Sequence, residues 1–171
     1  SVILLSPAQN KNSELVISEE NFESAEGSEI KYWKDKDNDK NAQTATLEAS
    51  PVLIYNGQAE TFSLDTIKIT DRAASLKLLD TDKNGKFDIV FVTEFKNIVV
   101  SEVMPSSGKI IDMYGAPTLT LDKDNDSLDF IIEKNGEAIE VSDLKKWDVI
   151  SFTESRDKSI YRVHVVNEVV E

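Results

Sequence analysis

The most regular chemical pattern in the chain is an acidic segment in which oxygen-bearing groups recur at nearly every second position. Its candidate metal ligands are Asp80, Asp82, Asn84, Lys86 through its main-chain carbonyl, and Asp88. Oxygen donors at this spacing can converge on a hard cation, and a glycine at the sixth position, Gly85, allows the sharp turn. The pattern therefore predicts a Ca²⁺ site with a dissociation constant on the order of 10⁻⁴ to 10⁻³ M, as in extracellular modules.

The segment departs from an EF-hand loop, because the twelfth position holds Phe91 instead of glutamate and the flanks are predicted strands. An alternative interpretation needs no ion. The step Asn84-Gly85 alone favours a tight β-hairpin, and Lys83 and Lys86 could neutralise the acidic turn. The sequence leaves both interpretations open.

Two other segments, 35–41 and 122–126, also place acids at alternate positions but lack the glycine. We interpret both as solvated loops, since runs of charge without apolar residues usually face water. The one histidine, His164, lies where residues 161–165 alternate between apolar and polar. This alternation predicts that His164 faces solvent on a strand.

The residue types exclude several kinds of catalysis. The chain has no cysteine and one histidine, which excludes thiolate chemistry, disulfides and any site needing two imidazoles within one chain. It contains neither a GxSxG nucleophile motif nor a phosphate-binding glycine loop. The 32 acidic residues include many carboxylate pairs, and sequence cannot select one for glycosidase chemistry. We expect a protein that is not an enzyme.

Composition narrows the class of partner. The chain has 171 residues, of which 40% are hydrophobic and 30% charged, so it should fold around a real core. With 19 basic and 32 acidic residues its net charge is −13, which disfavours nucleic acid and anionic membranes as partners. No apolar run approaches the roughly 20 residues that span a bilayer, so no membrane insertion is expected. The first residue is serine, and no signal-peptide pattern follows, which favours a processed or excised piece of a longer protein.

These residues must be positioned by β-structure, because apolar and polar residues alternate along most of the chain. The predicted strands are 15–17, 45–55, 61–69, 75–79, 87–95, 97–103, 109–113, 119–121, 128–133, 138–141, 148–153 and 159–166. Asn56-Gly57 and Asn135-Gly136 predict hairpin turns. Residues 18–29 could form a short helical segment, and residues 142–147 predict one helical turn that packs Trp147 onto the β core.

The expected fold is all-β: two small packed β units, sandwich or barrel-like, with at most one or two short helical turns. Residues 105–108 (Pro-Ser-Ser-Gly) form the best candidate boundary. The predicted units are therefore an N-terminal β unit, 1–104, with the acidic hairpin, and a small barrel-like unit, 105–171. The turn at 143–147 is expected to cap the second unit.

Residues 75–92, centred on the acidic turn, resemble a repeat module of large surface proteins of clostridia and other Gram-positive bacteria. Such proteins often carry S-layer homology domains elsewhere. Similar motifs lie upstream at 52–57 and downstream at 97–100, 135–136, 142–151 and 163–170, and their order agrees with the family, so the resemblance covers about residues 50–171. The family usually has an acidic residue where Asn84 stands. The resemblance implies an exported, non-catalytic module and supplies no catalytic residue.

The function expected from these observations is that of a structural or assembly module in an extracellular surface protein: a cell wall, S-layer-like or filament component. Its expected partners are neighbouring copies or flanking domains of the same surface protein, and cell-wall glycan. One alternative is a carbohydrate-binding or adhesion module of an extracellular enzyme, with Tyr32, Trp33 and Trp147 as candidate platform residues. A viral structural protein of similar β build is the other.

Overall fold

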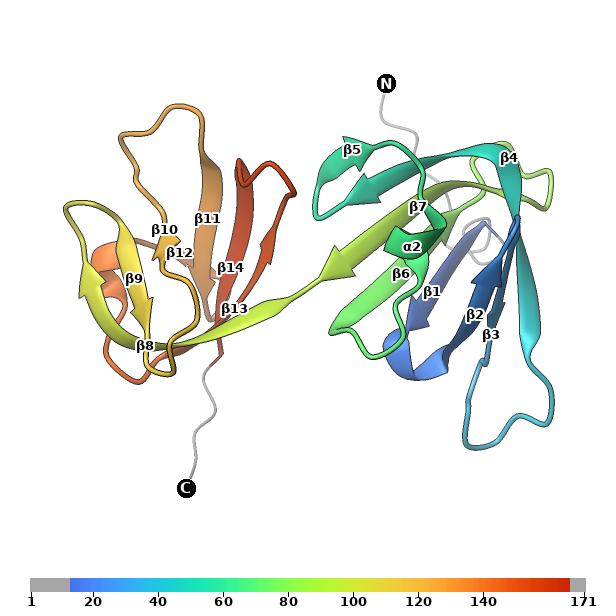
Figure 1. Ribbon diagram of the computed structural model, residues 1–171, viewed down its shortest axis with the longest axis horizontal. Helices are drawn as coiled ribbons and strands as arrows, with labels where there is room; N and C mark the ends of the chain where they lie inside the picture. Colours follow the sequence, from blue (N-terminus) through green and yellow to red (C-terminus); the bar gives the residue numbers. More distant parts are fainter. Residues whose placement is uncertain (1–12, 167–171) are drawn as a thin grey trace. The chain divides into compact units, whose positions relative to one another are not determined.

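The structure, a computed structural model, describes residues 13–166. The chain divides after Glu94 into two units, and each unit contains one seven-stranded sheet (Figure 1). The all-β class expected from the alternation of apolar and polar residues is confirmed, and helix is confined to three short turns among the described residues. No helix in this part of the chain is long and apolar enough to cross a membrane.

The first unit begins with an edge strand and ends with an inner strand. In chain order it contains β1 (Glu14–Ser18), η1 (Glu19–Asn21), β2 (Phe22–Glu26), β3 (Glu29–Tyr32), β4 (Gln43–Tyr55), β5 (Gln58–Glu60), α2 (Leu64–Ile67), β6 (Ala74–Leu79) and β7 (Phe87–Glu94). The strands lie in the order β1-β6-β7-β4-β3-β2, and β5 pairs with β4. β4 and β7 run parallel, while the other neighbours are antiparallel.

Strand β4 organises the first unit, because its first half pairs with β3 and its second half with β5 and β7. Its pairing with β7 shifts register between Leu47 and Val52, where Pro51 supplies no N–H to the ladder. On one side of this shift β4 pairs with β3, and on the other side it pairs with β5, within the same sheet. Leu53 and Leu78 lie fully buried in the core that this sheet encloses.

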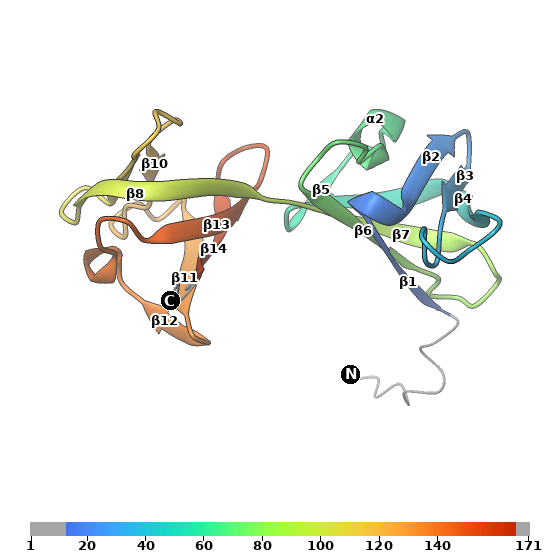
Figure 2. The ribbon, with the colours of Figure 1, turned by 90° about the horizontal axis from the view of Figure 1, so that it is seen from below.

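The second unit starts almost directly after the first, because β8 follows β7 with only Phe95 between them. In chain order it contains β8 (Lys96–Met104), β9 (Lys109–Asp112), β10 (Leu119–Thr120), β11 (Asp129–Lys134), β12 (Glu137–Ile139), η2 (Val141–Asp143), β13 (Val149–Glu154) and β14 (Ile160–Val166). The strand order is β10-β9-β8-β13-β14-β11-β12, with β11 and β14 parallel. Figure 2 shows β8 running along β13.

The second unit buries one face of each central strand, as the period of two predicts. Ile98 of β8 pairs with Ile150 of β13, which in turn pairs with Val165 of β14, and all three side chains are buried. β10 and β12 lie at the two ends of the strand order, so among the described strands the sheet does not close into a barrel. This arrangement leaves a strand edge at each end.

Both predicted hairpin turns are confirmed. Asn56 and Gly57 have φ of +45° and +85° between β4 and β5, and Asn135 and Gly136 have φ of +55° and +80° between β11 and β12. Two consecutive left-handed residues give the backbone twist that a two-residue hairpin needs, and an Asn-Gly step meets this requirement at low cost.

The boundary predicted at residues 105–108 is wrong, because those residues form the tight turn of the β8–β9 hairpin. Val103 pairs with Ile110 across this turn, and the other side of β8 pairs with β13. Residues 96–104 therefore belong to the second unit, whose sheet they organise. A loop-forming sequence marks a turn, but only the long-range pairing of the flanking strands decides whether that turn separates two units.

Three local predictions also need correction. Residues 61–69 contain the helical turn α2 (Leu64–Ile67) instead of a strand. The short helical segment expected within 18–29 is limited to the three residues of η1, and β2 and the first residue of β3 follow it. Trp147, predicted to pack onto the β core, is 62% exposed and has φ of +77°. Leu144 of the same segment is the residue whose side chain is buried. The part of the predicted resemblance at 167–170 lies outside the described residues.

Candidate functional site

The acidic segment predicted as a metal site forms the turn between β6 and β7. Asp80 is only 5% exposed, and its carboxylate accepts hydrogen bonds from the N–H of Asn84 at 3.2 Å and of Gly85 at 2.8 Å. Gly85 has φ of +89°, the left-handed conformation that the sequence pattern predicted for it. Asp80 therefore holds the turn closed from its buried side.

The remaining members of the segment also bond within the turn. Asp82 accepts the N–H of Asn84 at 3.2 Å, and the amide oxygen of Asn84 accepts the N–H of Lys86 at 2.8 Å. Asp88 accepts both the N–H of Thr81, at 3.1 Å, and its hydroxyl. The structure thus brings the predicted residues into one turn, in which most of their oxygens already accept hydrogen bonds.

The two carboxylates of Asp80 and Asp82 differ in their affinity for protons. Burial acts to raise the pKa of Asp80, but the N–H donors of Gly85 and Asn84 and the contact with Asp82 outweigh it, so its pKa lies below the usual value. Burial and the negative charges of Asp80 and Asp88 raise the pKa of Asp82. The crowding of these charges is the feature that a bound cation or a proton would relieve.

Within residues 13–166 no group of three or more His, Cys, Asp or Glu side chains is arranged to hold a metal ion. The oxygen atoms at the turn that a cation could use are those of the Asp80 and Asp82 carboxylates and of the Asn84 side-chain amide. These oxygens suit a hard cation in kind. The NH₂ group of Asn84 donates to Glu48 of β4 and, at 3.2 Å, to Asp82. In the structure the two carboxylates accept hydrogen bonds that close the turn, and Asn84 connects the turn to β4 through Glu48.

The other acidic segments lie in exposed loops. Asp35 accepts the N–H of Asp37 at 3.1 Å, and Asp122 accepts the N–H of Asp124 at 2.9 Å, so both carboxylates stabilise their own turns. His164 is exposed on β14, as predicted, with Nδ1 3.6 Å from a carboxylate oxygen of Glu133.

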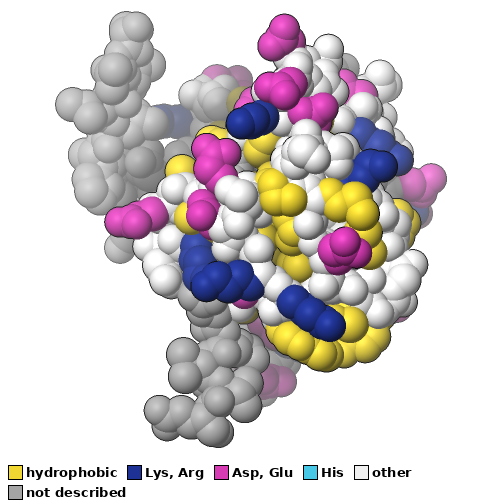
Figure 3. Space-filling model, turned by 90° about the vertical axis from the view of Figure 1, so that its left-hand side faces the viewer, with side chains coloured by type: hydrophobic (Ala, Val, Ile, Leu, Met, Phe, Trp, Pro, Cys, Tyr) yellow, Lys and Arg dark blue, Asp and Glu magenta, His cyan; other side chains and the backbone are white. Residues whose placement is uncertain are grey.

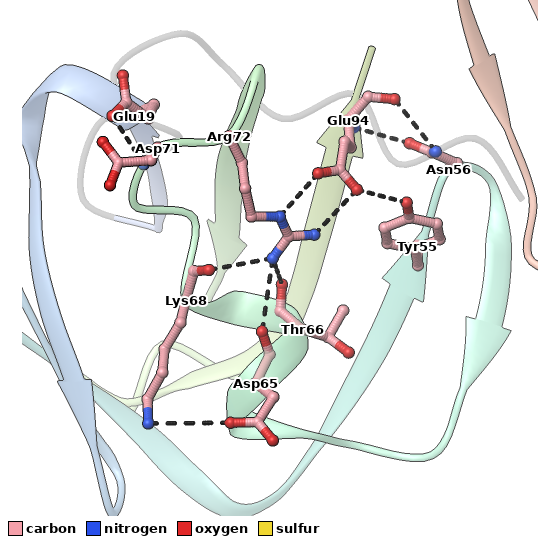
Figure 4. A network of polar contacts seen from close by, with 9 residues as sticks. All are labelled: Glu19, Tyr55, Asn56, Asp65, Thr66, Lys68, Asp71, Arg72 and Glu94. Atoms are coloured by element: carbon pink, nitrogen blue, oxygen red, sulfur yellow. Dashed lines mark hydrogen bonds and ion pairs between the residues drawn. The ribbon is translucent and has the colours of Figure 1, made fainter. Parts of the chain in front are cut away.

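Sequence reasoning missed a polar cluster centred on Arg72 and Glu94 (Figure 4). The guanidinium binds the Glu94 carboxylate through two nitrogens, at 2.7 and 3.0 Å, and both side chains are about three-quarters buried. The hydroxyl of Tyr55 donates to the same carboxylate at 2.7 Å, and Asn56 bonds the Glu94 backbone at 2.8 and 3.2 Å.

The cluster connects the end of β7 to the helical turn α2. Nη1 of Arg72 donates to the carbonyls of Thr66 at 2.9 Å and Lys68 at 3.0 Å, which lie at the end of α2 (Figure 4). A cation near helix carbonyls that lack partners stabilises them. Hydrogen bonding to Glu94 raises the pKa of Arg72. No motif spacing marks this pair, because Arg72 and Glu94 meet only when β6 and β7 pair.

A second carboxylate, Asp112 of the second unit, is buried at the end of β9. It accepts hydrogen bonds from the N–H groups of Val99, Tyr114 and Ala116, each at 2.9 Å. The hydrogen bond from the N–H of Ala116 lowers the pKa of Asp112. Burial acts to raise this pKa, but the other N–H donors lower it further, so it lies below the usual value. Asp112 thereby fixes the start of the segment that leads to β10.

Replacing Asp112 by asparagine should lower the melting temperature at pH 7 by several degrees, because an amide NH₂ group would face N–H donors. The folded-state pKa lies below the unfolded one, so this stabilisation is present above about pH 4 and is lost as the pH falls through the folded-state pKa. Melting curves of both proteins between pH 2.5 and 7 should therefore converge at low pH. Asp122→Asn, which loses one exposed turn bond, is the control; a constant difference between wild type and Asp112→Asn at every pH would contradict the assignment.

The second unit also contains two cavities. The larger, about 450 Å³, is lined by residues of β8, β10, β13 and β14, including Ile98, Leu119 and Phe152. The smaller, about 300 Å³, lies between the β8–β9 turn and η2 and is lined in part by Leu121 and Val141. Figure 3 views the second unit from the side of that turn and shows hydrophobic side chains exposed among charged ones.

No family model, no curated protein and no solved structure matches the chain. A function for it must therefore be argued from its own residues.

Proposed function

We propose that the chain is a non-catalytic structural module of an extracellular surface protein, in which it makes contacts with neighbouring copies or flanking domains. The proposal follows the sequence resemblance to Gram-positive surface repeats. Two β units joined through the single residue Phe95 suit a module that works in series with others.

The observation that carries the proposal is the use of the buried and half-buried polar side chains. Asp80, Asp112 and Ser155 each bind backbone N–H groups of a turn, and Arg72 and Glu94 bind each other. Each group stabilises the conformation of its own unit. Such use of polar groups supports a scaffold role, because a catalytic residue must keep an acid, base or nucleophile available to a substrate.

The location can be tested on cells of the organism that encodes the chain. Antibodies raised against the purified protein should label intact cells, and protease added outside should remove that signal. An unchanged intracellular marker is the control for cell integrity. Antigen found only after lysis would overturn the proposal.

Calcium is part of this proposal, with the turn at residues 80–88 as its site. An ion held by Asp80, Asp82 and Asn84 would offset the repulsion between carboxylates and make the hairpin more rigid. Binding to the folded state alone raises its stability with ligand concentration.

Millimolar Ca²⁺ should raise the melting temperature by a few degrees over chelator if the dissociation constant is about a tenth of the ion concentration. Asp82→Ala should remove this increase, since Asp82 faces the negative charges of both Asp80 and Asp88, which a bound cation would offset. Asp37→Ala, in the other acidic loop, should keep it. Equal melting temperatures in calcium and in chelator would show that the turn needs no ion.

A glycan-binding module is the second candidate, favoured by two exposed aromatic side chains on the second unit. Tyr114 is 76% exposed and Trp147 is 62% exposed. Tyr114 follows β9 and Trp147 precedes β13, and these two strands are the neighbours of β8 in the sheet. Exposed aromatic rings bind sugar faces by stacking. Retention of the protein on purified cell-wall polysaccharide, abolished by Trp147→Ala, would support this function; equal retention of both proteins would exclude Trp147 as the platform.

A further inference from the structure

The chain contains three Asn-Gly steps, at residues 56–57, 84–85 and 135–136. An asparagine side chain that precedes glycine is open to attack by the next backbone nitrogen, because glycine has no Cβ to crowd the approach. The three steps lie in the turns between β4 and β5, between β6 and β7, and between β11 and β12. Their local chemistry is the same, so the contacts around each step decide which of them can react.

The step at Asn56 is held through the asparagine side chain. Asn56 is buried, its amide oxygen accepts the N–H of Glu94 at 2.8 Å, and its NH₂ group donates to the Glu94 carbonyl at 3.2 Å. Its own backbone N–H donates to the carbonyl of Val92 at 2.9 Å. The amide carbon of Asn56 therefore cannot turn toward the nitrogen of Gly57 until these bonds break.

The step at Asn84 is held through both reacting groups. The nitrogen of Gly85, which would be the attacking atom, donates its hydrogen to the carboxylate of Asp80 at 2.8 Å. A carboxylate beside this nitrogen also disfavours the loss of the proton that the attack requires. The side chain of Asn84 accepts the N–H of Lys86 at 2.8 Å and donates to Glu48 of β4.

The step at Asn135 has neither restraint. Residues 135–138 are exposed, and within the described part of the chain no hydrogen bond involves the Asn135 side chain or the N–H of Gly136. A Cβ at Gly136 would meet no atom within 4 Å, so open space surrounds the turn. β12 has three residues and pairs with β11 alone, so this end of the hairpin can open at low cost.

We propose that Asn135 is a site of spontaneous deamidation, in which the backbone nitrogen of Gly136 attacks Cγ of Asn135. The new N–Cγ bond forms as the Cγ–Nδ2 bond breaks, and the side-chain nitrogen leaves as ammonia with the proton that Gly136 gives up. Water then adds to either carbonyl of the resulting succinimide ring and opens it. The products are aspartate and isoaspartate, and water is the only co-reactant.

The reaction changes the edge of the second unit. It adds one negative charge to a chain whose net charge is −13. Isoaspartate also places the side-chain methylene in the backbone, which lengthens the two-residue turn that pairs Lys134 with Glu137. Since β12 has β11 as its partner in the sheet, the loss of this register loosens the end of the sheet. The converted fraction therefore increases with the age of the molecule and marks a weakened edge strand.

Timed incubation of the purified full-length chain at neutral pH, followed by peptide mass spectrometry, tests the site. Asn135 should convert to the acid roughly thirtyfold faster than Asn56 or Asn84, because at least two hydrogen bonds must break before either of those can react. Electron-transfer fragmentation should find both aspartate and isoaspartate at position 135. Hydrogen exchange at residues 137–139 should become faster as the product accumulates.

The same incubation in guanidinium chloride is the matched control, because unfolding removes the contacts and the three steps should then convert at similar rates. Incubation continues until this unfolded sample has converted. Gly136→Ala, whose Cβ has room in the fold, should slow conversion at Asn135, and circular dichroism establishes that the variant is folded. Equal rates at the three steps of the folded wild type overturn the proposal, as does an Asn135 that stays intact while the unfolded chain converts.

Discussion

Gly108→Ala should destabilise the second unit by about 4 kcal/mol or more, enough to unfold much of it. A Cβ atom at this position would lie 2.2 Å from the carbonyl oxygen of Leu121, and the backbone φ is +68°. Left-handed φ alone costs roughly 1–2 kcal/mol for a residue with a side chain, and the clash with backbone adds to it. Urea denaturation followed by circular dichroism measures the loss.

Gly115→Ala is the matched control for this substitution. Gly115 also has left-handed φ, +85°, but a Cβ there would meet no atom within 4 Å. Its replacement should cost only about 1 kcal/mol, the conformational part of the penalty. Equal losses for the two alanine variants would contradict the close approach of the β8–β9 turn to the end of β10.

Arg72→Ala should destabilise the first unit by about 2–3 kcal/mol. Removing one partner of a fully buried ion pair costs about 3–5 kcal/mol, and this pair is about one-quarter exposed, which lowers the cost. The substitution leaves the Glu94 carboxylate with Tyr55 as its hydrogen-bond partner in Figure 4, and it frees the carbonyls at the end of α2. Chemical denaturation measures the change.

A double-mutant cycle with Glu94→Gln separates the pair from the rest of the cluster. We expect the two substitutions together to cost clearly less than the sum of each alone, since both remove the same contact. The exposed pair Lys77 and Glu14, 3.6 Å apart, is the control and should couple by less than about 1 kcal/mol. Additive losses at Arg72 and Glu94 would show that the ion pair contributes nothing of its own.

The sequence predicts the local structure of this protein well where the pattern is determined by neighbouring residues. The alternation of apolar and polar residues at 160–166 predicts strand β14, because burial alternates along a strand. The two Asn-Gly steps predict two hairpin turns of the protein, because these residue types adopt positive φ at low cost. The turn of Asp80 and Gly85 is predictable for the same reason.

Features that depend on distant residues could not be predicted in this way. The parallel pairing of β4 with β7 and of β11 with β14 joins segments far apart in sequence, and periodicity carries no information on the partner. Residues 61–69 alternate like a strand, yet the contact of Arg72 with carbonyls near 66 favours a helical turn there. Tertiary contacts override local propensity in such segments.

The candidate site shows the same division. Spacing identifies Asp80, Asp82 and Asn84 as neighbours in one turn, which the structure confirms. It does not reveal that Glu48 of β4 also contacts Asn84, or that Asp112 is buried while the similar Asp122 is not. These differences arise from strand pairing, which decides which carboxylates find N–H donors.

Cross-linking of intact cells with a membrane-impermeant, lysine-reactive reagent tests the central claim most directly. If the chain is a structural module of a surface assembly, antibodies against it should detect cross-linked products that contain neighbouring copies or flanking domains of the same surface protein. Mass spectrometry of those products identifies the partners. Recovery of the chain only as an unlinked species, or only from inside the cell, would contradict the claim.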